Sequence, residues 1–444
     1  MAQIKSALFL GIGGIGMSAI ARYFKHLGMV VVGYDKTSSN LTEALEKEGI
    51  QVFFEDRLDM IVREFDLVVY TPAIPANSVL LNHYKSNHPM MMKRSEVLGL
   101  ITKNAFTIAV AGSHGKTTVC SMIAHVLKDS GYDCTAFLGG ISKNFNSNYI
   151  GGNNNVVIVE ADEYDRSFHR LNPNIAVITS VDSDHLDIYG SLEKIEEAFI
   201  EFTNKVDEEG IVFVQGQVKI IDRIVRKVKT YSARTGADLM IDTLKSVGGN
   251  SVFTTNRTSV EFTLYIGGKH NVENALAAIS VAMELGISED KIAKAIASFR
   301  GIKRRFEKHI ETADLVYIDD YAHHPEELNA LIDGVKGLYP GRKITLIFQP
   351  HLFSRTQDLA VEFGKALTQV DRVFLLDIYP ARELPIAGVT SDLILQNIAH
   401  DQKKIIKRED IASELKQVDV DVLLTVGAGD IDRSVELIKN YYQG

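Results

Sequence analysis

Residues 107–118, Thr-Ile-Ala-Val-Ala-Gly-Ser-His-Gly-Lys-Thr-Thr, constrain the fold more than any other part of the chain. An apolar run of strand type leads into two glycines, and a helical pattern of apolar residues follows them. A strand that turns through glycines into a helix is typical of α/β proteins, in which helices connect parallel strands. The sequence therefore predicts a parallel α/β sheet with this turn at the carboxyl end of a strand.

The same glycine turn has the residue types that hold a nucleotide phosphate. Gly112 and Gly115 allow backbone N–H groups to surround an anion, Lys116 adds a positive charge, and the Thr117 hydroxyl is a suitable Mg²⁺ ligand. The common phosphate loop has four residues between its glycines and this turn has two, but the strand and helix around it favour an ATP site. The predicted ATP contacts in this turn are Gly112, Ser113, His114, Gly115, Lys116, Thr117 and Thr118.

Length and charge restrict the class of protein. A chain of 444 residues predicts two or three α/β domains, and a net charge of −9 argues against a nucleic-acid partner. No apolar run approaches the ~20 residues of a membrane span, and residues 1–10 lead directly into a strand rather than forming a signal peptide. We expect a cytoplasmic monomer or homodimer without membrane insertion. The only cysteines, Cys120 and Cys134, exclude a disulfide framework and a cysteine-based zinc site.

A second glycine turn lies near the amino terminus. A strand at residues 6–10 enters Gly-Ile-Gly-Gly-Ile-Gly at 11–16, and a second strand at 30–34 ends before Asp35. Such glycines permit close approach of a diphosphate, and Asp35 could accept a hydrogen bond from a ribose. This domain ends near residue 103, too early for a dinucleotide site with its catalytic unit, so a nucleotide diphosphate joined to another group fits better than NAD. Thr71, after a strand at 67–70, is equally consistent with a ligand contact and a plain turn.

Two central strands end in acidic residues. Residues 156–160 form a buried strand that ends in Glu160, and the acidic residues after it fit a solvated turn equally well. The next strand, 175–181, precedes two aspartates and His185. Carboxylates beside a phosphate loop are the ligands that Mg²⁺ requires. Glu160 is therefore a predicted metal ligand, and His185 is a candidate for a second ion, although a lone histidine is more often structural.

The rest of the chain combines regions without recognisable motifs and regions rich in polar side chains. The Gly- and Asn-rich stretch 139–155 predicts a mobile loop, and residues 211–265 are β-rich without chemical motifs. A helix then begins near Asn271 and Asn274, which the sequence alone favours as helix caps over contacts to a base. From residue 315 onward, three strand–loop–helix units place His and Arg side chains on strand-end loops, and a last strand leads into a C-terminal helix.

Nine ordered sequence blocks together resemble the Mur ligase family. They are GIGGIGMS (11–18), AGSHGKTT (111–118), EADEYD (160–165), DHLDIYG (184–190), HNVENALAA (270–278), RRF (304–306), DDYAHHP (319–325), FQPHLFSRT (348–356) and GAGDI (427–431). The resemblance covers essentially the whole chain and implies three α/β domains. These are a Rossmann-like UDP-sugar-binding domain (1–103), a central P-loop ATPase-type domain (104–306) and a C-terminal Rossmann-like α/β domain (307–444).

The resemblance also implies an activity, with ATP as co-substrate and two Mg²⁺ ions. The blocks are similar to the branch of the family that joins L-alanine to UDP-N-acetylmuramate. One ion would lie on Thr117 and Glu160 and the second on His185. Further implied ATP contacts are Asn271, Asn274, Arg305 and Asp320. Implied UDP-sugar contacts are Gly11, Gly13, Gly14, Gly16, Asp35, Thr71 and Tyr321. Implied catalytic residues are Lys116, His185, Arg305, His323, His351 and Arg355.

Three departures and three alternatives accompany this interpretation. Ala322 replaces a glycine of many relatives, and Leu352 replaces an arginine of some, which removes one expected cation near the substrate. The helix around 196–203 has no lysine that could be carboxylated to bridge metal ions, which fits the alanine-adding branch. The alternatives are a recycling ligase that joins a murein tripeptide to the same UDP-sugar, a nucleotide-binding switch module without ligase activity, and a Rossmann dehydrogenase.

Overall fold

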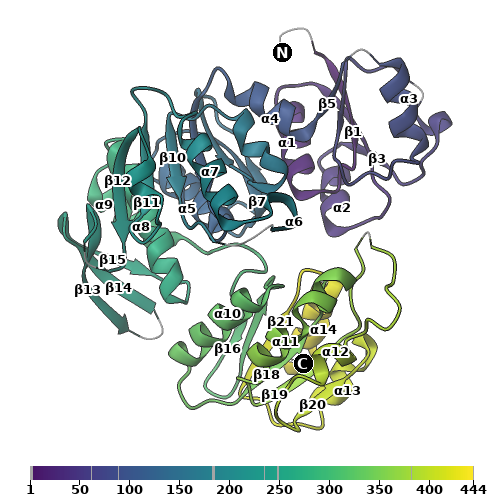
Figure 1. The fold of residues 1–444 in the computed structure, drawn as a ribbon, viewed down its shortest axis with the longest axis vertical. Helices are drawn as coiled ribbons and strands as arrows, with labels where there is room; N and C mark the ends of the chain where they lie inside the picture. The colour runs from purple at the N-terminus through teal and green to yellow at the C-terminus, as the bar shows by residue number, and fades with distance from the viewer. Residues whose placement is uncertain are drawn as a thin grey trace. The chain divides into compact units, whose positions relative to one another are not determined.

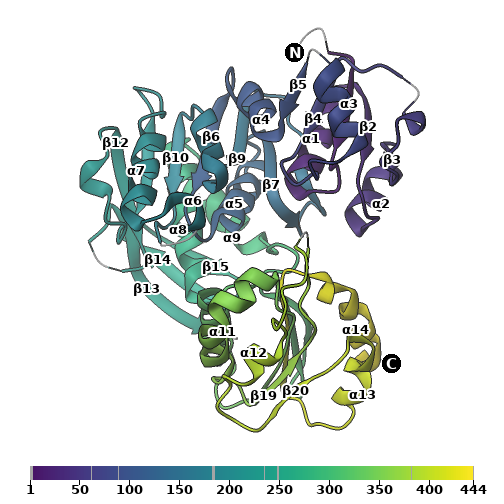
Figure 2. The same cartoon turned by 45° about the vertical axis from the view of Figure 1, so that its right-hand side comes forward.

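The computed structural model describes residues 4–443 apart from 62, 89, 183–185, 235, 248–249 and 382, and apart from the side chains of 165, 186, 187 and 269. The chain divides into two compact units. The first comprises residues up to 247 with 251–265 and 270–300, and the second comprises 248–250, 266–269 and 301 onward. Figures 1 and 2 show sheets with covering helices in both units, so the predicted α/β class is confirmed. In the described part of the chain, no helix is long and apolar enough to cross a membrane.

The first unit begins with a parallel sheet of strand order β3-β2-β1-β4-β5. The order reverses between β1 and β4, so the loops after these strands meet at the point where such sheets bind ligands. The strands are β1 (Ser6–Leu10), β2 (Val30–Tyr34), β3 (Gln51–Phe53), β4 (Leu67–Tyr70) and β5 (Met91–Lys93). The helices are α1 (Ile15–His26), α2 (Asn40–Lys47), η1 (Leu58–Met60), α3 (Val79–Asn87) and α4 (Arg94–Thr102).

The larger sheet of this unit has the order β15-β14-β13-β12-β11-β10-β6-β9-β7-β8. The central strands β6, β9 and β10 are parallel and apolar, and β6 leads into the phosphate-type turn. The strands are β6 (Phe106–Ala111), β7 (Thr135–Ser142), β8 (Ser147–Ile150), β9 (Val156–Glu160), β10 (Ile175–Ile178), β11 (Ile211–Gln215), β12 (Lys227–Ser232), β13 (Leu239–Val247), β14 (Asn250–Thr255) and β15 (Thr258–Leu264). The helices are α5 (Lys116–Asp129), η2 (Tyr164–Arg170), α6 (Leu186–Tyr189), α7 (Leu192–Thr203), η3 (Ile221–Arg223), α8 (Lys269–Glu284) and α9 (Glu289–Ser298).

The prediction of a mobile loop at 139–155 is wrong. Most of this stretch belongs to the antiparallel hairpin β7–β8, which lies beside α1 in both views of Figures 1 and 2. Asn148 on β8 donates hydrogen bonds to the Ser18 hydroxyl (2.9 Å) and the Ile15 carbonyl (2.5 Å), and the rings of Tyr23 and Phe137 lie 5.4 Å apart. These contacts with a helix more than 100 residues earlier order the hairpin, and local Gly and Asn content does not reveal them.

The second unit has a single sheet of order β16-β17-β21-β18-β19-β20, antiparallel only at β16. Apolar clusters lie on both of its faces, one around Phe348 and the other around Tyr317. The strands are β16 (Glu307–Glu311), β17 (Val316–Asp320), β18 (Ile344–Phe348), β19 (Arg372–Leu375), β20 (Lys403–Ile405) and β21 (Val422–Val426). The helices are α10 (Pro325–Leu338), α11 (Phe353–Leu367), α12 (Asp392–Leu395), η4 (Arg408–Asp410), α13 (Ile411–Leu415), η5 (Asp430–Ser434) and α14 (Val435–Gln443).

Several predicted strand ends differ from the observed ones. The strand predicted at 175–181 ends at Ile178, and the first strand predicted from residue 315 onward begins at Val316 and continues through Asp319 and Asp320. Asp320 stays in the ladder because it lies opposite Val426 of β21. Pairing with a neighbouring strand decides where a strand ends, and that neighbour is about 100 residues away in the sequence.

Candidate active site

The turn between β6 and α5 has the backbone conformation that its glycines permit. Gly112 has φ +139° and Gly115 has φ +81°, in the region that residues with a side chain rarely adopt. A Cβ on Gly112 would lie 2.1 Å from the Thr179 hydroxyl. The segment after β10 braces the turn, because the His114 N–H donates to the Ser180 hydroxyl (3.0 Å). The shape of the loop is therefore set before any ligand binds, with the first N–H groups of α5 at its rim.

Lys116 is held inside this loop by two acceptors. Its Nζ donates to Oε1 of Glu163 (2.7 Å) and to the Gly112 carbonyl (2.6 Å). Glu163 is only 2% exposed, and burial raises the pKa of its carboxyl while the charge of Lys116 opposes that shift. The possibility of a solvated acidic turn after Glu160 is therefore wrong for Glu163. Sequence reasoning missed this residue as part of the site, although it lies in the EADEYD block.

Thr117 and Glu160 meet as the sequence predicts. The Thr117 hydroxyl donates to Oε2 of Glu160 (3.2 Å), and the Gly139 N–H donates to Oε1 (2.6 Å). A hydroxyl and a carboxylate fit Mg²⁺, which binds one or two carboxylates together with phosphate oxygens and water. Among the described residues there is no group of three or more His, Cys, Asp or Glu side chains that could hold a metal ion. His185, the predicted ligand of a second ion, lies outside the described residues.

The structure brings the two asparagines of α8 to the phosphate loop. A Cβ on Gly115 would lie 2.8 Å from Oδ1 of Asn274, and Nδ2 of Asn274 donates to Oδ1 of Asn271 (3.1 Å). Asn271 is 5% exposed. The sequence alone favoured helix capping for these residues, but Asn274 lies against the turn that would hold the triphosphate. Their role as adenine contacts stays a prediction.

The amino-terminal glycine turn, Thr71 and Asp35 also come together. A Cβ on Gly11, which has φ +86°, would lie 2.6 Å from Cγ2 of Thr71. The Gly13 N–H donates to Oδ2 of Asp35 (2.8 Å), so this carboxylate braces the turn. Gly14 immediately precedes α1. These residues lie at the strand-order reversal, which supports a ligand site there.

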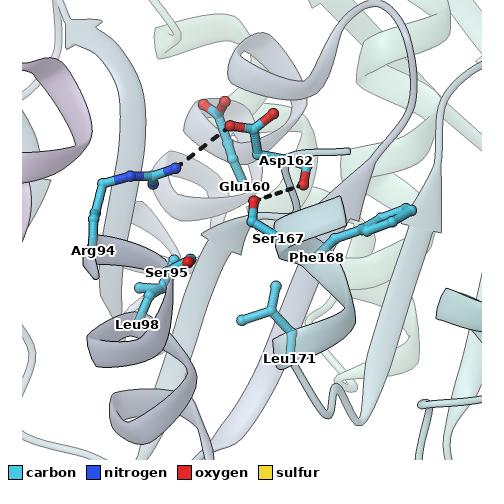
Figure 3. Close-up of a pocket in the computed structure, with 8 residues that line it drawn as sticks. All are labelled: Arg94, Ser95, Leu98, Glu160, Asp162, Ser167, Phe168 and Leu171. Atoms are coloured by element: carbon cyan, nitrogen blue, oxygen red, sulfur yellow. Dashed lines mark hydrogen bonds and ion pairs between the residues drawn. The ribbon is translucent and has the colours of Figure 1, made fainter. Parts of the chain in front are cut away.

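Arg94 is a further cation at this edge that sequence reasoning missed. It follows β5 directly, and its Nη1 would lie 3.0 Å from a Cβ on Gly16. Its Nη2 reaches Oδ2 of Asp162 at 3.5 Å (Figure 3). A basic residue immediately after a parallel strand was the available signal, because all such positions share one edge of the sheet.

The remaining predicted residues belong to the second unit. Most lie at the carboxyl ends of β17 and β18, whereas Arg305 precedes β16, whose start lies opposite the end of β17 because the two strands are antiparallel. Asp320 accepts hydrogen bonds from the N–H groups of Phe306 (2.6 Å) and Ala322 (2.8 Å), and burial raises the pKa of its carboxyl to about 6. Arg305 lies close enough for its charge to oppose that rise. Ala322, one of the departures from the family pattern, thus contributes its backbone to the position of Asp320.

A cluster of rings lies at the same edge. The ring of His323 lies 5.4 Å from that of Tyr321 and 6.0 Å from that of His351, and His351 stacks on Tyr379. Burial lowers the pKa of His323, an effect that Glu327 opposes and Arg355 reinforces. Burial therefore favours the neutral form of the His323 imidazole.

Leu352 and Arg304 have structural roles beside this cluster. Leu352 has φ +73° and its N–H donates to the Tyr379 carbonyl (3.0 Å), so it sets the turn into α11, which carries Arg355. Arg304 donates to Asp319 (3.2 Å) and to the carbonyls of Gly427 (2.5 Å) and Gly429 (3.1 Å). These contacts hold the Arg304 side chain against other residues of the second unit, whereas the neighbouring Arg305 is exposed.

Three models of one family match successive parts of the chain. The Mur ligase family catalytic domain matches residues 7–105, the Mur ligase middle domain 110–282, and the glutamate ligase domain of Mur ligases 304–429. The chain belongs to the Mur ligase family. Its members are ATP-dependent ligases, so the predicted enzyme class is confirmed and the switch-module and dehydrogenase alternatives are not supported.

Curated relatives and solved structures resemble this family member over its full length. The UDP-N-acetylmuramate–L-alanine ligase of Flavobacterium johnsoniae is 47% identical, with 98% of both chains covered. That of Cytophaga hutchinsonii is 45% identical, with 99% of this chain and 97% of the relative covered. The crystal structure of UDP-N-acetylmuramate-alanine ligase from Thermotoga maritima matches with a TM-score of 0.85 at 29% identity over 99% of both chains. The crystal structure of a murein peptide ligase from Psychrobacter arcticus matches with a TM-score of 0.74 at 21% identity over 98% of both chains, which shows a shared fold.

Proposed function

We propose that this chain joins L-alanine to UDP-N-acetylmuramate with ATP, giving UDP-N-acetylmuramoyl-L-alanine, ADP and phosphate for peptidoglycan synthesis. The observation that supports it most is the pairing of Lys116 with Glu163 and of Thr117 with Glu160, in the same unit as the amino-terminal glycine turn. The names of the relatives supply the substrates. We further propose that it acts in the cytoplasm as a monomer or homodimer, with domain boundaries near residues 103 and 306.

The reaction requires activation of a carboxylate, because a carboxylate and an amine do not condense in water without a leaving group. An oxygen of the lactyl carboxylate attacks the γ-phosphorus of ATP and ADP leaves, which forms an acyl phosphate. The alanine nitrogen then attacks the acyl carbon, and the bond from that carbon to the bridging oxygen breaks as phosphate leaves. Lys116 exchanges its contacts with Glu163 and Gly112 for γ-phosphate oxygens and stabilises the charge of the transferred group.

Thr117 and Glu160 would hold one Mg²⁺, and His185 is proposed to hold a second. When bound, Mg²⁺ neutralises charge on the phosphates. Gly139 positions Glu160 for this role through its backbone N–H. The amino-terminal turn with Asp35 and Thr71 would bind the UDP group, and Asn271 and Asn274 the adenine.

The second unit is proposed to contribute the other substrate contacts. Tyr321 is proposed to contact the UDP-sugar, and Arg305 and Asp320 to contact ATP. His351 and Arg355 would orient the reacting carboxylate and the amino acid. Free alanine is an ammonium ion, which cannot attack a carbonyl carbon, and the neutral imidazole of His323 is available to take its proton.

An isotope experiment tests this chemistry. With ¹⁸O in the lactyl carboxylate, we expect one labelled oxygen in each phosphate released, because the bridging oxygen leaves with phosphorus. Parallel reactions with L-alanine and with L-Ala-γ-D-Glu-diaminopimelate test the amine substrate, and we expect ADP release only with L-alanine. Unlabelled phosphate would exclude the acyl phosphate, and release with the tripeptide alone would identify a recycling ligase.

A further inference from the structure

A pocket of the first unit lies between α4 and the segment that follows β9 (Figure 3). Arg94, Ser95 and Leu98 line it from α4, and residues between 160 and 171 line it from the opposite side. Those residues are Glu160, Asp162, Ser167, Phe168 and Leu171. The pocket thus has a guanidinium on one side and two carboxylates on the other, one of which belongs to the proposed Mg²⁺ ligand Glu160.

Arg94 lies between the glycine turn and these carboxylates. It is the first residue of α4, directly after β5, at the same sheet edge as the turn after β1. Its Nη1 would be 3.0 Å from a Cβ on Gly16 and its Cδ 3.2 Å, so the glycine leaves room for the arginine beside the first turn of α1. From there the guanidinium reaches toward Asp162 (Figure 3).

The ion pair of Arg94 with Asp162 is weak. The atoms Nη2 and Oδ2 are 3.5 Å apart, longer than the 2.7–2.9 Å typical of a charge-assisted hydrogen bond. The side chains are 27% and 40% exposed, and an ion pair of such exposure stabilises a protein little. Asp162 also accepts from the Tyr164 N–H (3.1 Å), which holds its carboxylate independently of Arg94. The guanidinium can therefore change partner at small cost.

We propose that Arg94 binds an anionic oxygen of the UDP-sugar substrate and releases Asp162 as the substrate enters. This inference rests on the proposed function. The substrate carries a diphosphate and a lactyl carboxylate, and that carboxylate must approach the phosphate loop, where Thr117 contacts Glu160; Asp162 lines the same pocket as Glu160. A guanidinium offsets the repulsion from those carboxylates and binds two oxygens of a phosphate or carboxylate in parallel. Arg94 then determines specificity for an anionic nucleotide sugar.

Calorimetric titration without ATP tests the inference. UDP-N-acetylmuramate and UDP-N-acetylglucosamine, which lacks the lactyl group, are titrated into wild type, Arg94→Met, Arg94→Lys, Asp162→Asn and Arg223→Met. Arg223 is the matched control, because it forms a half-exposed ion pair with Glu196 (2.9 Å) elsewhere in the first unit. We expect Arg94→Met to weaken binding of UDP-N-acetylmuramate by about tenfold or more. Arg94→Lys should recover part of this lost affinity, and Arg223→Met should leave the affinity unchanged.

The two sugars identify the oxygen that Arg94 contacts. If Arg94→Met loses affinity equally for both sugars, Arg94 contacts the diphosphate. If it loses affinity for UDP-N-acetylmuramate alone, Arg94 contacts the lactyl carboxylate. Asp162→Asn keeps the acceptor for Tyr164 and removes the competing charge, so we expect equal or tighter binding. A loss in Asp162→Asn as large as in Arg94→Met would overturn the inference, because the pair would then be structural.

The remaining outcomes separate this inference from the function on which it rests. If wild type binds UDP-N-acetylmuramate and forms product while Arg94→Met binds it equally well, the inference is wrong and the proposed function stands. If wild type does not bind UDP-N-acetylmuramate, the proposed function itself fails. If Arg94→Met does not fold, the Arg94→Lys variant decides. We expect its affinity for UDP-N-acetylmuramate to be at least a few fold lower than that of wild type, and an unchanged affinity would overturn the inference.

Discussion

The ammonium of Lys116 lies 2.7 Å from the carboxylate of Glu163, a side chain almost completely buried beneath the phosphate loop. The pair keeps the loop charge-compensated without nucleotide, and it links the residue proposed to stabilise the transferred phosphate to the stability of the fold. Removing one member of a buried pair leaves the other charge in a poorly solvated place. Substitution of Lys116 therefore has two effects, on chemistry and on stability, and they can be separated.

Lys116→Met is expected to abolish ADP release and to destabilise the protein by an amount on the order of 3 kcal/mol at neutral pH. UDP-sugar binding should survive, because that site is on the other sheet. The double variant Lys116→Met with Glu163→Gln should recover most of the stability but no activity. Lys128→Met, on the same helix and ion-paired with Asp133, is the control and should stay active. Urea unfolding and an ADP assay measure both effects, and an active double variant would contradict the role of Lys116.

Gly139→Ala should raise the Mg²⁺ concentration needed for half-maximal activity, as Glu160→Gln should. A Cβ at this position would lie 2.4 Å from Oε2 of Glu160, so the carboxylate must move away from Thr117. Gly337→Ala is the control, because a Cβ there meets nothing within 4 Å. Mg²⁺ titrations of the three variants make the comparison. An unchanged Mg²⁺ requirement in both Gly139→Ala and Glu160→Gln would place the metal elsewhere.

Asp35→Ala should weaken the binding of UDP-N-acetylmuramate about tenfold or more and leave the affinity for ATP unchanged. The carboxylate accepts the Gly13 N–H at 2.8 Å, and its loss removes both a charge-assisted hydrogen bond and the brace of the turn. Asp66→Ala is the matched control, since Asp66 also accepts backbone N–H groups, from Lys5 and Ser6, but at the start of β1. Calorimetry of both nucleotides provides the measurement. Weaker ATP binding with normal UDP-sugar binding would show that this turn is not the UDP site.

The carboxyl group of Asp320 should titrate near pH 6 rather than near 3.8. Because the folded-state pKa is raised, the protonated form stabilises the fold below about pH 4, and that contribution is lost as the pH rises through about 6. At ~1.4 kcal/mol per pH unit, the loss is no more than about 3 kcal/mol. The carboxyl carbon resonance that disappears in Asp320→Asn reports the midpoint, and a midpoint near 4 would contradict burial as the dominant influence.

The sequence by itself determined the phosphate loop, the α/β class, most strands and the residues at their carboxyl ends. Short windows suffice for these features, because glycine, lysine and threonine between a strand and a helix set the local backbone conformation and its chemistry. The meeting of Thr117 with Glu160 followed from the same rule, since parallel strands bring their carboxyl ends to one edge.

Only the tertiary structure decided which side chains hold these groups in place. Gly139 binds Glu160 from a hairpin that composition indicated as a loop, Glu163 is buried under Lys116 rather than solvated, and Arg94 reaches a carboxylate 68 residues away. Each contact joins segments separated by 21 to 68 residues. Burial and charge pairing at such separations depend on how helices and sheets pack, and that packing is a property of the whole fold rather than of any short stretch of sequence.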